Sequence, residues 1–422
     1  MAAETSAFRA PKGTNDLLPP QSRQWQAVTR LAIDTFAQAG YAPVETPSFE
    51  HTEVFERGVG ESSEVVNKQM YTFTDLGGSS LTLRPEGTAP VMRAVLEHGL
   101  HRGPLPVKLA YAGLMFRQER PQKGRFRQFS QLGIEAIGSD SPMVDAEVIE
   151  IGARFLREAG VAVKLLLNSI GHVDPSCRGA YLETLSRWLD DNSKRLGDDD
   201  RERSKTNPLR TFDSKDDKTQ TALADAPVIT EHLCDPCREH FESVRGFLED
   251  LGTGFDLQPR LVRGLDYYTR TAFEFVATEL GAQNAVGGGG RYDGLSQALG
   301  GPPLPGIGFA LGLDRIVMAR SDNGDSEPVG SIDVYIVSLG EEAQREALKL
   351  TTRLRAAGIG ADLDLAGRAM KGQMKDADRS GARWALILGA EELAGDTVTL
   401  KDLQSGEQRM IPVDSIETSV RE

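Results

Sequence analysis

Two neighbouring stretches decide the fold of this chain: residues 263–268 read RGLDYY, and residues 287–295 read GGGGRYDGL. The first joins an arginine to two phenolic side chains, which suits a pocket for a small polar substrate. The second opens with four glycines, which cost backbone entropy but let a phosphate ester approach the main chain closely. Taken alone, the glycines also fit a flexible loop or a β-bulge. The apolar, strand-like residues 273–276 and the polar residues 291–293 on either side favour the edge of a site.

The composition is that of a soluble globular protein with two to three domains. The chain has 422 residues, of which 39% are apolar and 26% charged. No apolar run approaches a membrane-spanning length, and residues 1–13 lack a signal-peptide core. Three cysteines give no disulfide framework, which indicates a cytoplasmic protein. The net charge of −14 argues against general nucleic-acid binding but allows a local basic groove, because distant exposed charges are screened.

Apolar spacing before residue 170 predicts several helices and strands. Residues 25–39 have helical spacing that ends at Gly40, and two prolines within residues 41–47 suit an edge strand. Residues 107–138 alternate on both sides of a basic loop, which predicts a long antiparallel hairpin. The remaining predictions are a strand turning into a helix at 81–88, a helix at 143–159 and a strand at 161–167.

The sequence pattern changes three times in the second half of the chain. Residues 172–258 hold helix-like stretches around a charge-dense segment, which indicates an inserted module with a solvated or mobile part. Strand-like sequence returns at 262–276, and residues 306–316 read as a strand that turns into a helix. A polar linker at 321–328 then precedes about 90 residues in which strands and helices alternate, as in a small α/β domain.

The loop at residues 117–127 carries five cations against one acid. The planar fork of arginine suits bidentate contacts with phosphate. A solvated charge run is the alternative interpretation. The alternating flanks place the loop at the tip of the predicted hairpin, where it can fold over a polyphosphate.

A second basic cluster lies in the C-terminal domain. Arg368, Lys371, Lys375 and Arg379 share one face if residues 368–380 form a helix. Such a face is a common footprint for a nucleic-acid backbone, although an ordinary exposed helix has the same spacing.

The stretch Cys234–His240 has C-x2-C-x2-H spacing and offers three zinc ligands. A closed zinc site needs four, and the third cysteine, Cys177, is distant in sequence. We therefore expect no zinc, and interpret the thiols as buried or idle.

Together these stretches resemble the class II aminoacyl-tRNA synthetases, and specifically the histidyl-tRNA synthetase family. The resemblance covers nearly the whole chain. Residues 263–268 and 287–295 are similar to the two signatures peculiar to the histidine enzymes. The other matching stretches are the N-terminal signature at 11–16, motif 1 at 40–50, motif 2 at 111–135 and motif 3 at 306–316.

The resemblance implies an α+β fold with an antiparallel sheet flanked by helices. The catalytic core would comprise residues 1–171 and 259–320, interrupted by a mostly helical insertion at 172–258. A linker at 321–330 would lead to an α/β anticodon-binding domain at 331–422. Motif 1 implies a homodimer.

The implied activity is the ATP-dependent attachment of L-histidine to tRNA(His) through a histidyl-adenylate. By resemblance, Arg117 and Arg263 clamp the α-phosphate of ATP, while Arg125 and Arg315 hold the outer phosphates with Mg²⁺. The sequence assigns no magnesium ligands. Three further ATP contacts follow from the resemblance, namely Phe126 under the adenine, Gly288 and Gly289.

The residues implied for the amino-acid pocket suit histidine on chemical grounds. Glu86, Thr88 and Gln131 offer acceptors for an ammonium group, and Tyr267 belongs to the same signature as Tyr268. Glu135 and Tyr268 can each bind one imidazole nitrogen. A site that leaves polar groups unpaired around a wrong side chain discriminates by roughly 10⁴ or more. A structural salt bridge for Glu135 and core packing for Tyr268 remain the alternatives.

Three other functions stay open. A non-catalytic regulatory subunit of ATP phosphoribosyltransferase shares the catalytic core but usually lacks the anticodon-binding domain. An RNA-binding scaffold needs no converging phosphate clamps such as Arg117, Arg263 and Arg315. A class II enzyme for another amino acid is disfavoured by Glu135 together with residues 263–268.

Overall fold

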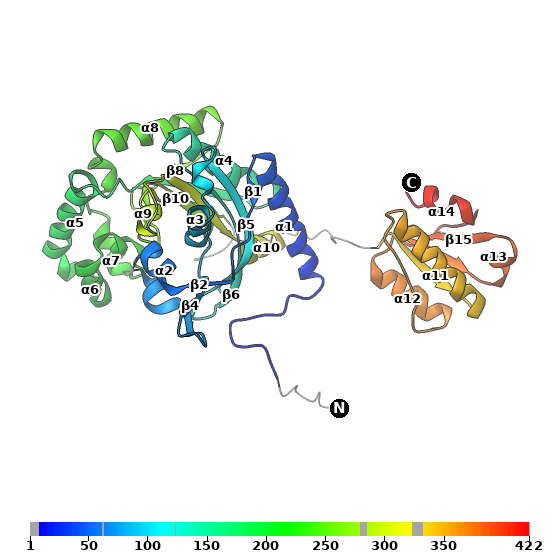
Figure 1. The fold of residues 1–422 in the computed structure, drawn as a ribbon. Helices are drawn as coiled ribbons and strands as arrows, with labels where there is room; N and C mark the ends of the chain where they lie inside the picture. Colours follow the sequence, from blue (N-terminus) through cyan, green and yellow to red (C-terminus); the bar gives the residue numbers. More distant parts are fainter. Residues whose placement is uncertain (1–7, 61–62, 123, 279–284, 323–331, 422) are drawn as a thin grey trace. The chain divides into compact units, whose positions relative to one another are not determined.

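The computed structural model describes residues 8–60, 63–122, 124–278, 285–322 and 332–421, and the chain forms two compact units (Figure 1). The first unit is residues 1–326 and the second is residues 327–422. Their boundary falls in the predicted linker, most of which lies outside the described residues. Within the described ranges, we find no helix long and apolar enough to cross a membrane. The finer division of the first unit into a split core and an insertion stays a prediction.

An eight-stranded sheet forms the centre of the first unit (Figure 1). The pairs between the inner strands are antiparallel, and only the short edge strands β1 and β8 pair in parallel. The strand order is β1 (Ala42–Pro43), β5 (Val107–Phe116), β6 (Gln128–Ile137), β11 (Gly306–Gly312), β10 (Ala285–Arg291), β9 (Thr269–Ala277), β7 (Val163–Ser169) and β8 (Asp256–Leu257). The predicted α+β class, the hairpin β5–β6 and the proline-containing edge strand are confirmed.

One face of this sheet is covered by helices that bury a large apolar core. Phe36 of α1 (Gln21–Gln38), Phe155 of α4 (Pro142–Glu158) and Phe309 of β11 pack against one another with ring centroids 5.6 and 5.8 Å apart. The helices α8 (Asp235–Asp250) and α10 (Leu313–Asp322) complete this layer. Because side chains alternate along a strand, Phe273 and Phe275 point into this core and Glu274 points away from it.

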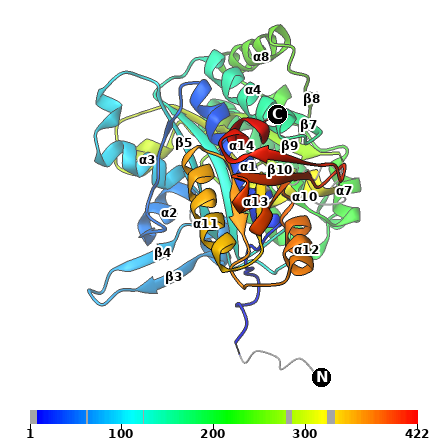
Figure 2. The same ribbon diagram turned by 90° about the vertical axis from the view of Figure 1, so that its right-hand side faces the viewer.

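The opposite face of the sheet is only partly covered. The helices α2 (Thr52–Val59), α3 (Thr88–Glu97) and α9 (Leu295–Ala298) pack over it around Tyr111 and Tyr292. A small sheet of β2 (Phe49–His51), β4 (Ser80–Leu83) and β3 (Tyr71–Thr74) lies beside them. Figure 2 shows its β3–β4 hairpin extending away from the body of this unit. The uncovered part of the face is where a ligand can reach the sheet.

A row of small residues crosses this open face. The strand register places Tyr111, Gly133, Ala310, Gly288 and Glu274 side by side across five strands. The four glycines therefore belong to strand β10, with register shifts on both sides of them, and do not form a flexible loop. Large side chains stand at the two ends of the row, and its middle is almost bare backbone.

The end of the glycine strand is fixed by a buried ion pair. The guanidinium of Arg291 binds both carboxylate oxygens of Asp145 in α4, at 2.6 and 3.0 Å, and neither side chain is exposed. The same guanidinium donates to the carbonyl oxygens of Ser139 and Ser141. These bonds satisfy a charge that would otherwise be costly to bury. Arg291 thus stabilises the fold. It does not form the edge of a site, although its position in the sequence had suggested that role.

Between β7 and β9, the chain is mostly helical, and this segment is called the insertion below. Its helices are α5 (Ala180–Asp191), α6 (Asp198–Thr206), α7 (Asp217–Leu223) and α8, joined by the short helices η3 (Pro175–Gly179), η4 (Ser193–Arg195), η5 (Pro208–Asp213) and η6 (Ile229–Glu231). Tyr181, Leu185 and Leu223 form an apolar core that also contains Tyr268 and Ala272. The insertion therefore packs directly against the segment that contains the RGLDYY stretch.

The second unit is an α/β domain with a five-stranded mixed sheet. The strand order is β13 (Ala361–Leu363), β12 (Val334–Ser338), β14 (Trp384–Leu388), β15 (Thr397–Asp402) and β16 (Gln408–Pro412). The first three strands are parallel and the last two are antiparallel to their neighbours. The helices are α11 (Glu341–Ala356), α12 (Met370–Ser380), α13 (Ala390–Ala394), η8 (Val413–Ser415) and α14 (Ile416–Ser419). The predicted alternation is confirmed.

The row of small residues makes a testable prediction about stability. A Cβ atom added at Gly288 would lie 2.8 Å from Arg263 Nη1 and would also collide with the carbonyl oxygen of Phe273. We expect Gly288→Ala to lower the free energy of unfolding by about 1–3 kcal/mol, the usual cost of overpacking. Urea unfolding of the purified protein measures this change.

The matched control is Gly246→Ala in helix α8, where nothing lies within 4 Å of an added Cβ. Alanine there should stabilise by about 0.5–1 kcal/mol, because glycine is the poorer helix former. Equal effects of the two substitutions would show that space over strand β10 is not limiting.

Candidate active site

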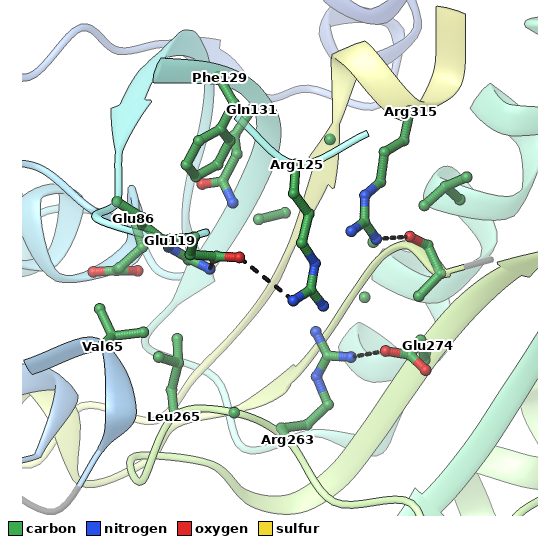
Figure 3. A pocket seen from close by; sticks show the side chains of 18 of the residues that line it. Val65, Glu86, Glu119, Arg125, Phe129, Gln131, Arg263, Leu265, Glu274 and Arg315 are labelled. Atoms are coloured by element: carbon green, nitrogen blue, oxygen red, sulfur yellow. Dashed lines mark hydrogen bonds and ion pairs between the residues drawn. The ribbon is translucent and has the colours of Figure 1, made fainter. Parts of the chain in front are cut away.

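A cavity of about 270 Å³ lies over the row of small residues (Figure 3). Its floor includes Gly288, Ala310 and Gly312 of the central strands. Its walls come from the β5–β6 loop, the start of α3, the RGLDYY stretch and the start of α10. Segments that are far apart in the sequence therefore meet around one space.

Most of the side chains predicted for a site line this cavity. They are Glu86, Thr88, Arg117, Arg125, Phe126, Gln131, Arg263, Tyr267, Tyr268, Gly288 and Arg315. Two predicted residues are not part of the lining. Gly289 faces the apolar core beside Phe273, and Glu135 is fully buried below the surface of the cavity.

Four arginines line the cavity, Arg117, Arg125, Arg263 and Arg315, and the last three gather at one end of it. Figure 3 shows Arg125, Arg263 and Arg315 pointing toward one another into it. Arg263 donates to Glu274 at 2.8 Å, and Arg125 lies 3.4 Å from Glu119. Burial lowers the pKa of the Arg315 guanidinium, and the neighbouring Arg125 lowers it further. So much positive charge in a half-enclosed space favours a polyanion as ligand.

Backbone carbonyls and an aromatic ring fix the direction of two of these arginines. Arg117 donates to the carbonyl oxygen of Pro85 at 2.8 Å and stacks over Phe129, with the guanidinium carbon 5.4 Å from the ring centroid. Arg315 donates to the carbonyl oxygens of Gly124, at 3.1 Å, and Ala285. Both guanidinium groups are thus preorganised before any ligand binds.

The other end of the cavity is acidic and phenolic. Glu86 is 3% exposed and accepts hydrogen bonds from the backbone N–H groups of Thr88 and Ala89, at 2.8 and 2.9 Å. These donors belong to the first turn of helix α3, a place that favours a carboxylate. Tyr267 approaches Glu86 at 3.4 Å, and Tyr267 and Tyr268 pack with ring centroids 4.7 Å apart. This end suits a small cation.

Glu135 lies directly beneath this acidic end. Its two carboxylate oxygens accept hydrogen bonds from Thr88 Oγ1, at 2.7 Å, and from the Tyr292 hydroxyl. Gly308 of the neighbouring strand leaves room for it, since a Cβ there would overlap the carboxylate. Burial raises the pKa of Glu135 to about 8, against the opposing effect of these two hydrogen bonds.

Comparison with known proteins agrees with this geometry. The family model described as histidyl-tRNA synthetase matches residues 13–316, and the model of the anticodon binding domain matches residues 333–422. The chain belongs to the histidyl-tRNA synthetase family.

Individual relatives cover almost the whole chain. The histidine–tRNA ligases of Saccharopolyspora erythraea and Corynebacterium kroppenstedtii are 51% and 50% identical, over 99% and 98% of this chain and 99% and 97% of their own. The crystal structure of the apo S. aureus histidyl-tRNA synthetase has a TM-score of 0.81 and 36% identity, covering 98% of this chain and all of that one. The family assignment therefore extends over both units.

The sequence analysis missed three acidic residues that this family member places in its cavity, Glu119, Glu274 and Asp314. A signal for Glu274 was present, because alternation with Phe273 and Phe275 puts it on the face away from the core. Glu119 was counted only as the single acid of the basic loop. Lys123 of that loop lies outside the described residues.

The basic face predicted in the second unit is only partly formed. Helix α12 begins at Met370, so Arg368 precedes it and is ion-paired with Asp364 and Asp376. Arg379 lies 3.7 Å from the same Asp376. Acids within the stripe therefore neutralise two of its four cations, and the assignment of this face to nucleic acid stays a prediction. Lys371 and Lys375 are exposed, and neither has an ion pair within the described residues.

The predicted set Cys234–His240 does not converge on one point. His240 turns toward the core, 3.6 Å from Asp145. Cys234 and Cys237 instead lie beside His172 and Cys177. The expectation that a fourth ligand is lacking is thus wrong, because the fold brings two more from the start of the insertion.

The raised pKa of Glu135 predicts a pH dependence of stability. With a pKa of about 8 when folded and about 4.5 when unfolded, the folded state holds one extra proton between these pH values. Stability from this group therefore falls as pH rises through that window, by at most about 1.4 kcal/mol per pH unit. Glu135→Gln, which mimics the neutral acid, should remove this dependence.

Urea unfolding of the parent and the Glu135→Gln variant at a series of pH values measures the difference between their free energies of unfolding. The variant should gain stability relative to the parent as pH rises. A difference that does not change between pH 5 and pH 8 would mean that Glu135 is ionised in the fold.

Proposed function

We propose that this chain is a histidine–tRNA ligase that works through a histidyl-adenylate formed in the cavity on the central sheet. The observation that carries the proposal is the junction of two unlike half-sites in one cavity. Four arginines suit the phosphates of ATP, and the acidic, phenolic end suits histidine. The chain also belongs to a family of synthetases and carries the anticodon binding domain.

In the first step, a carboxylate oxygen of histidine attacks the α-phosphorus of ATP and pyrophosphate leaves. Arg117 and Arg263 are the clamps that we assign to the α-phosphate. Negative charge develops there, and fixed cations lower the barrier because they need not reorganise. No protein nucleophile is required, since positioning two bound substrates supplies much of the rate.

In the second step, a ribose hydroxyl of the terminal adenosine of the tRNA attacks the carbonyl carbon of the adenylate. The ester forms and AMP leaves. The bare backbone at Gly288 gives the adenylate access to the sheet, and Phe126 at the β5–β6 loop is the surface that we assign to the adenine. Arg125 and Arg315 are assigned to the outer phosphates of ATP.

Histidine recognition is assigned to the opposite end. Glu86, Thr88 and Gln131 face the ammonium group, with Tyr267 supporting Glu86. Tyr268 is 8% exposed and takes one imidazole nitrogen. The second nitrogen is assigned to Glu135, whose carboxylate also accepts a hydrogen bond from the Thr88 hydroxyl.

Mg²⁺ is expected to accompany ATP and to neutralise the charge of the leaving pyrophosphate. Glu119 and Glu274 supply carboxylate oxygens beside the arginines, which is the ligand type that Mg²⁺ prefers. We assign these two residues to the ion. Both carboxylates are paired with arginine in the free protein. When MgATP binds, the arginines would turn to the phosphates and the carboxylates to the ion.

The tRNA is assigned to the second unit through the exposed Lys371 and Lys375. A homodimer and a cytoplasmic location remain expectations from the family. The regulatory-subunit alternative is less supported, because this chain retains both the anticodon binding domain and the arginine cluster.

The test of the proposed activity is ATP–pyrophosphate exchange with each of the twenty amino acids. Exchange with histidine alone is expected. Arg263→His should reduce it by about 10²–10³, the usual loss when one fixed donor to a transition state is removed. Arg187→His on the exposed surface of α5 is the control and should exchange at the parent rate. A folded parent that exchanges with no amino acid would contradict the proposal.

The role of the second unit has a separate test. Lys371→Glu with Lys375→Glu should raise the KM for tRNA(His) in aminoacylation and reduce the salt dependence of kcat/KM, because backbone phosphate contacts are lost. Exchange without tRNA should not change. Arg345→Glu with Lys349→Glu on α11 is the matched charge reversal. If both double variants impair charging equally, net charge explains the effect and the assigned surface is wrong.

A further inference from the structure

Four potential metal ligands converge at the base of the insertion. They are Nδ1 of His172 and the Sγ atoms of Cys177, Cys234 and Cys237, and all four atoms lie within 4.8 Å of one another. The His172 nitrogen is 3.0 Å from the sulfur of Cys237 and 3.7 Å from that of Cys234. None of the three cysteines forms a disulfide.

The spacing matches what a tetrahedral zinc ion requires. With Zn–S distances near 2.3 Å and Zn–N distances near 2.1 Å, ligand atoms in a tetrahedron are about 3.5–3.8 Å apart. The observed limit of 4.8 Å leaves only a small contraction. A Cys₃His set with four protein ligands is also a composition typical of closed, structural zinc sites.

The burial and packing around the four ligands are those of a metal site and not of an accidental contact. Cys177 and Cys237 are 1% and 0% exposed, whereas His172 and Cys234 are half-buried, which leaves the ion a path from solvent. Gly171 lies so close to Cys177 that an added Cβ would be 2.9 Å from its sulfur. All three cysteines of the chain take part in the cluster.

We infer that His172, Cys177, Cys234 and Cys237 form a structural Zn²⁺ site that ties the start of the insertion to the beginning of its last helix, α8. His172 and Cys177 lie at the start of the insertion, and Cys234 and Cys237 lie at the beginning of α8, where the chain returns. An ion that closes this long loop stabilises the fold by restricting the unfolded chain.

The site is also connected to the cavity through the residue after Cys177. The guanidinium of Arg178 is buried and donates to the carbonyl oxygens of Ile170, Gly171 and Tyr268, at 2.9, 2.9 and 2.7 Å. Tyr268 lines the cavity at the end assigned to histidine. The ion therefore fixes the turn that holds Tyr268 in position, a consequence that rests on the proposed function.

Metal analysis of the full chain, purified without chelator under reducing conditions, is the direct test. Mass spectrometry of the metal content should find about one zinc per chain. Cys177→Ser with Cys234→Ser should carry almost none. His172→Cys should retain the metal, because it replaces one good zinc ligand by another. His232→Gln, in the same insertion but outside the cluster, is the matched control and should also retain it.

A second measurement keeps the inference falsifiable if the double variant does not fold. The parent, stripped of metal and reloaded with Co²⁺, should show the visible absorption of tetrahedral cobalt and thiolate-to-cobalt charge transfer. Removal of the metal should lower Tm by several degrees, and zinc should restore it. Reduced, folded parent that binds neither zinc nor cobalt would overturn the inference.

Steady-state kinetics test the connection between the metal site and Tyr268. Loss of the metal should raise the KM for histidine several-fold and leave the KM for ATP unchanged. Equal changes in both constants would mean that the ion supports the fold without positioning Tyr268. A chain that lacks exchange activity would refute the proposed function and leave the metal analysis valid.

Discussion

The cavity on the central sheet depends on one steric constraint, the absence of large side chains in the middle of a row that crosses that sheet. Gly133, Ala310 and Gly288 occupy that middle, with Tyr111 and Glu274 at the ends. A larger residue at Gly288 would meet Arg263 and the backbone of β9. Glycine within a strand costs roughly 0.5–1 kcal/mol relative to alanine. The bare floor leaves room for the two ligands that we propose to lie against the sheet.

The charges over this floor explain how the free protein tolerates four arginines in one cavity. Glu119 and Glu274 neutralise Arg125 and Arg263, and backbone carbonyls orient Arg117 and Arg315. A bound polyphosphate can replace these partners with stronger, charge-assisted contacts. Beneath the opposite end, Glu135 is fully buried, and this burial is why its carboxyl favours the protonated form. The two ends of the cavity thus differ in charge before substrates arrive.

The sequence predicted the parts of this structure that follow from local pattern. Alternation around the basic loop predicted the β5–β6 hairpin, and helical spacing predicted α1, α4 and α11. Most of the ATP and histidine contacts that the family resemblance named line the cavity, although their roles remain predictions. Local pattern placed Arg368 on a helix face, but nearby acids pair with it.

What the sequence did not predict depends on contacts between distant segments. The four glycines became a central strand because β9 and β11 pair with both of its edges. The metal ligands were missed because His172 and Cys177 meet Cys234 and Cys237 only when the insertion folds back on itself. Cross-strand register likewise decides that Glu135 lies below the cavity, and one-dimensional spacing carries no information about it.

The central claim is that one cavity holds histidine and the α-phosphate of ATP together. The most direct measurement is a crystal structure of the chain with a non-hydrolysable sulfamoyl analogue of histidyl-adenylate. The account predicts the sulfamoyl group between Arg117 and Arg263, the adenine at Phe126 and the imidazole against Tyr268. An analogue bound elsewhere, or bound with its imidazole at the arginine end, would contradict it.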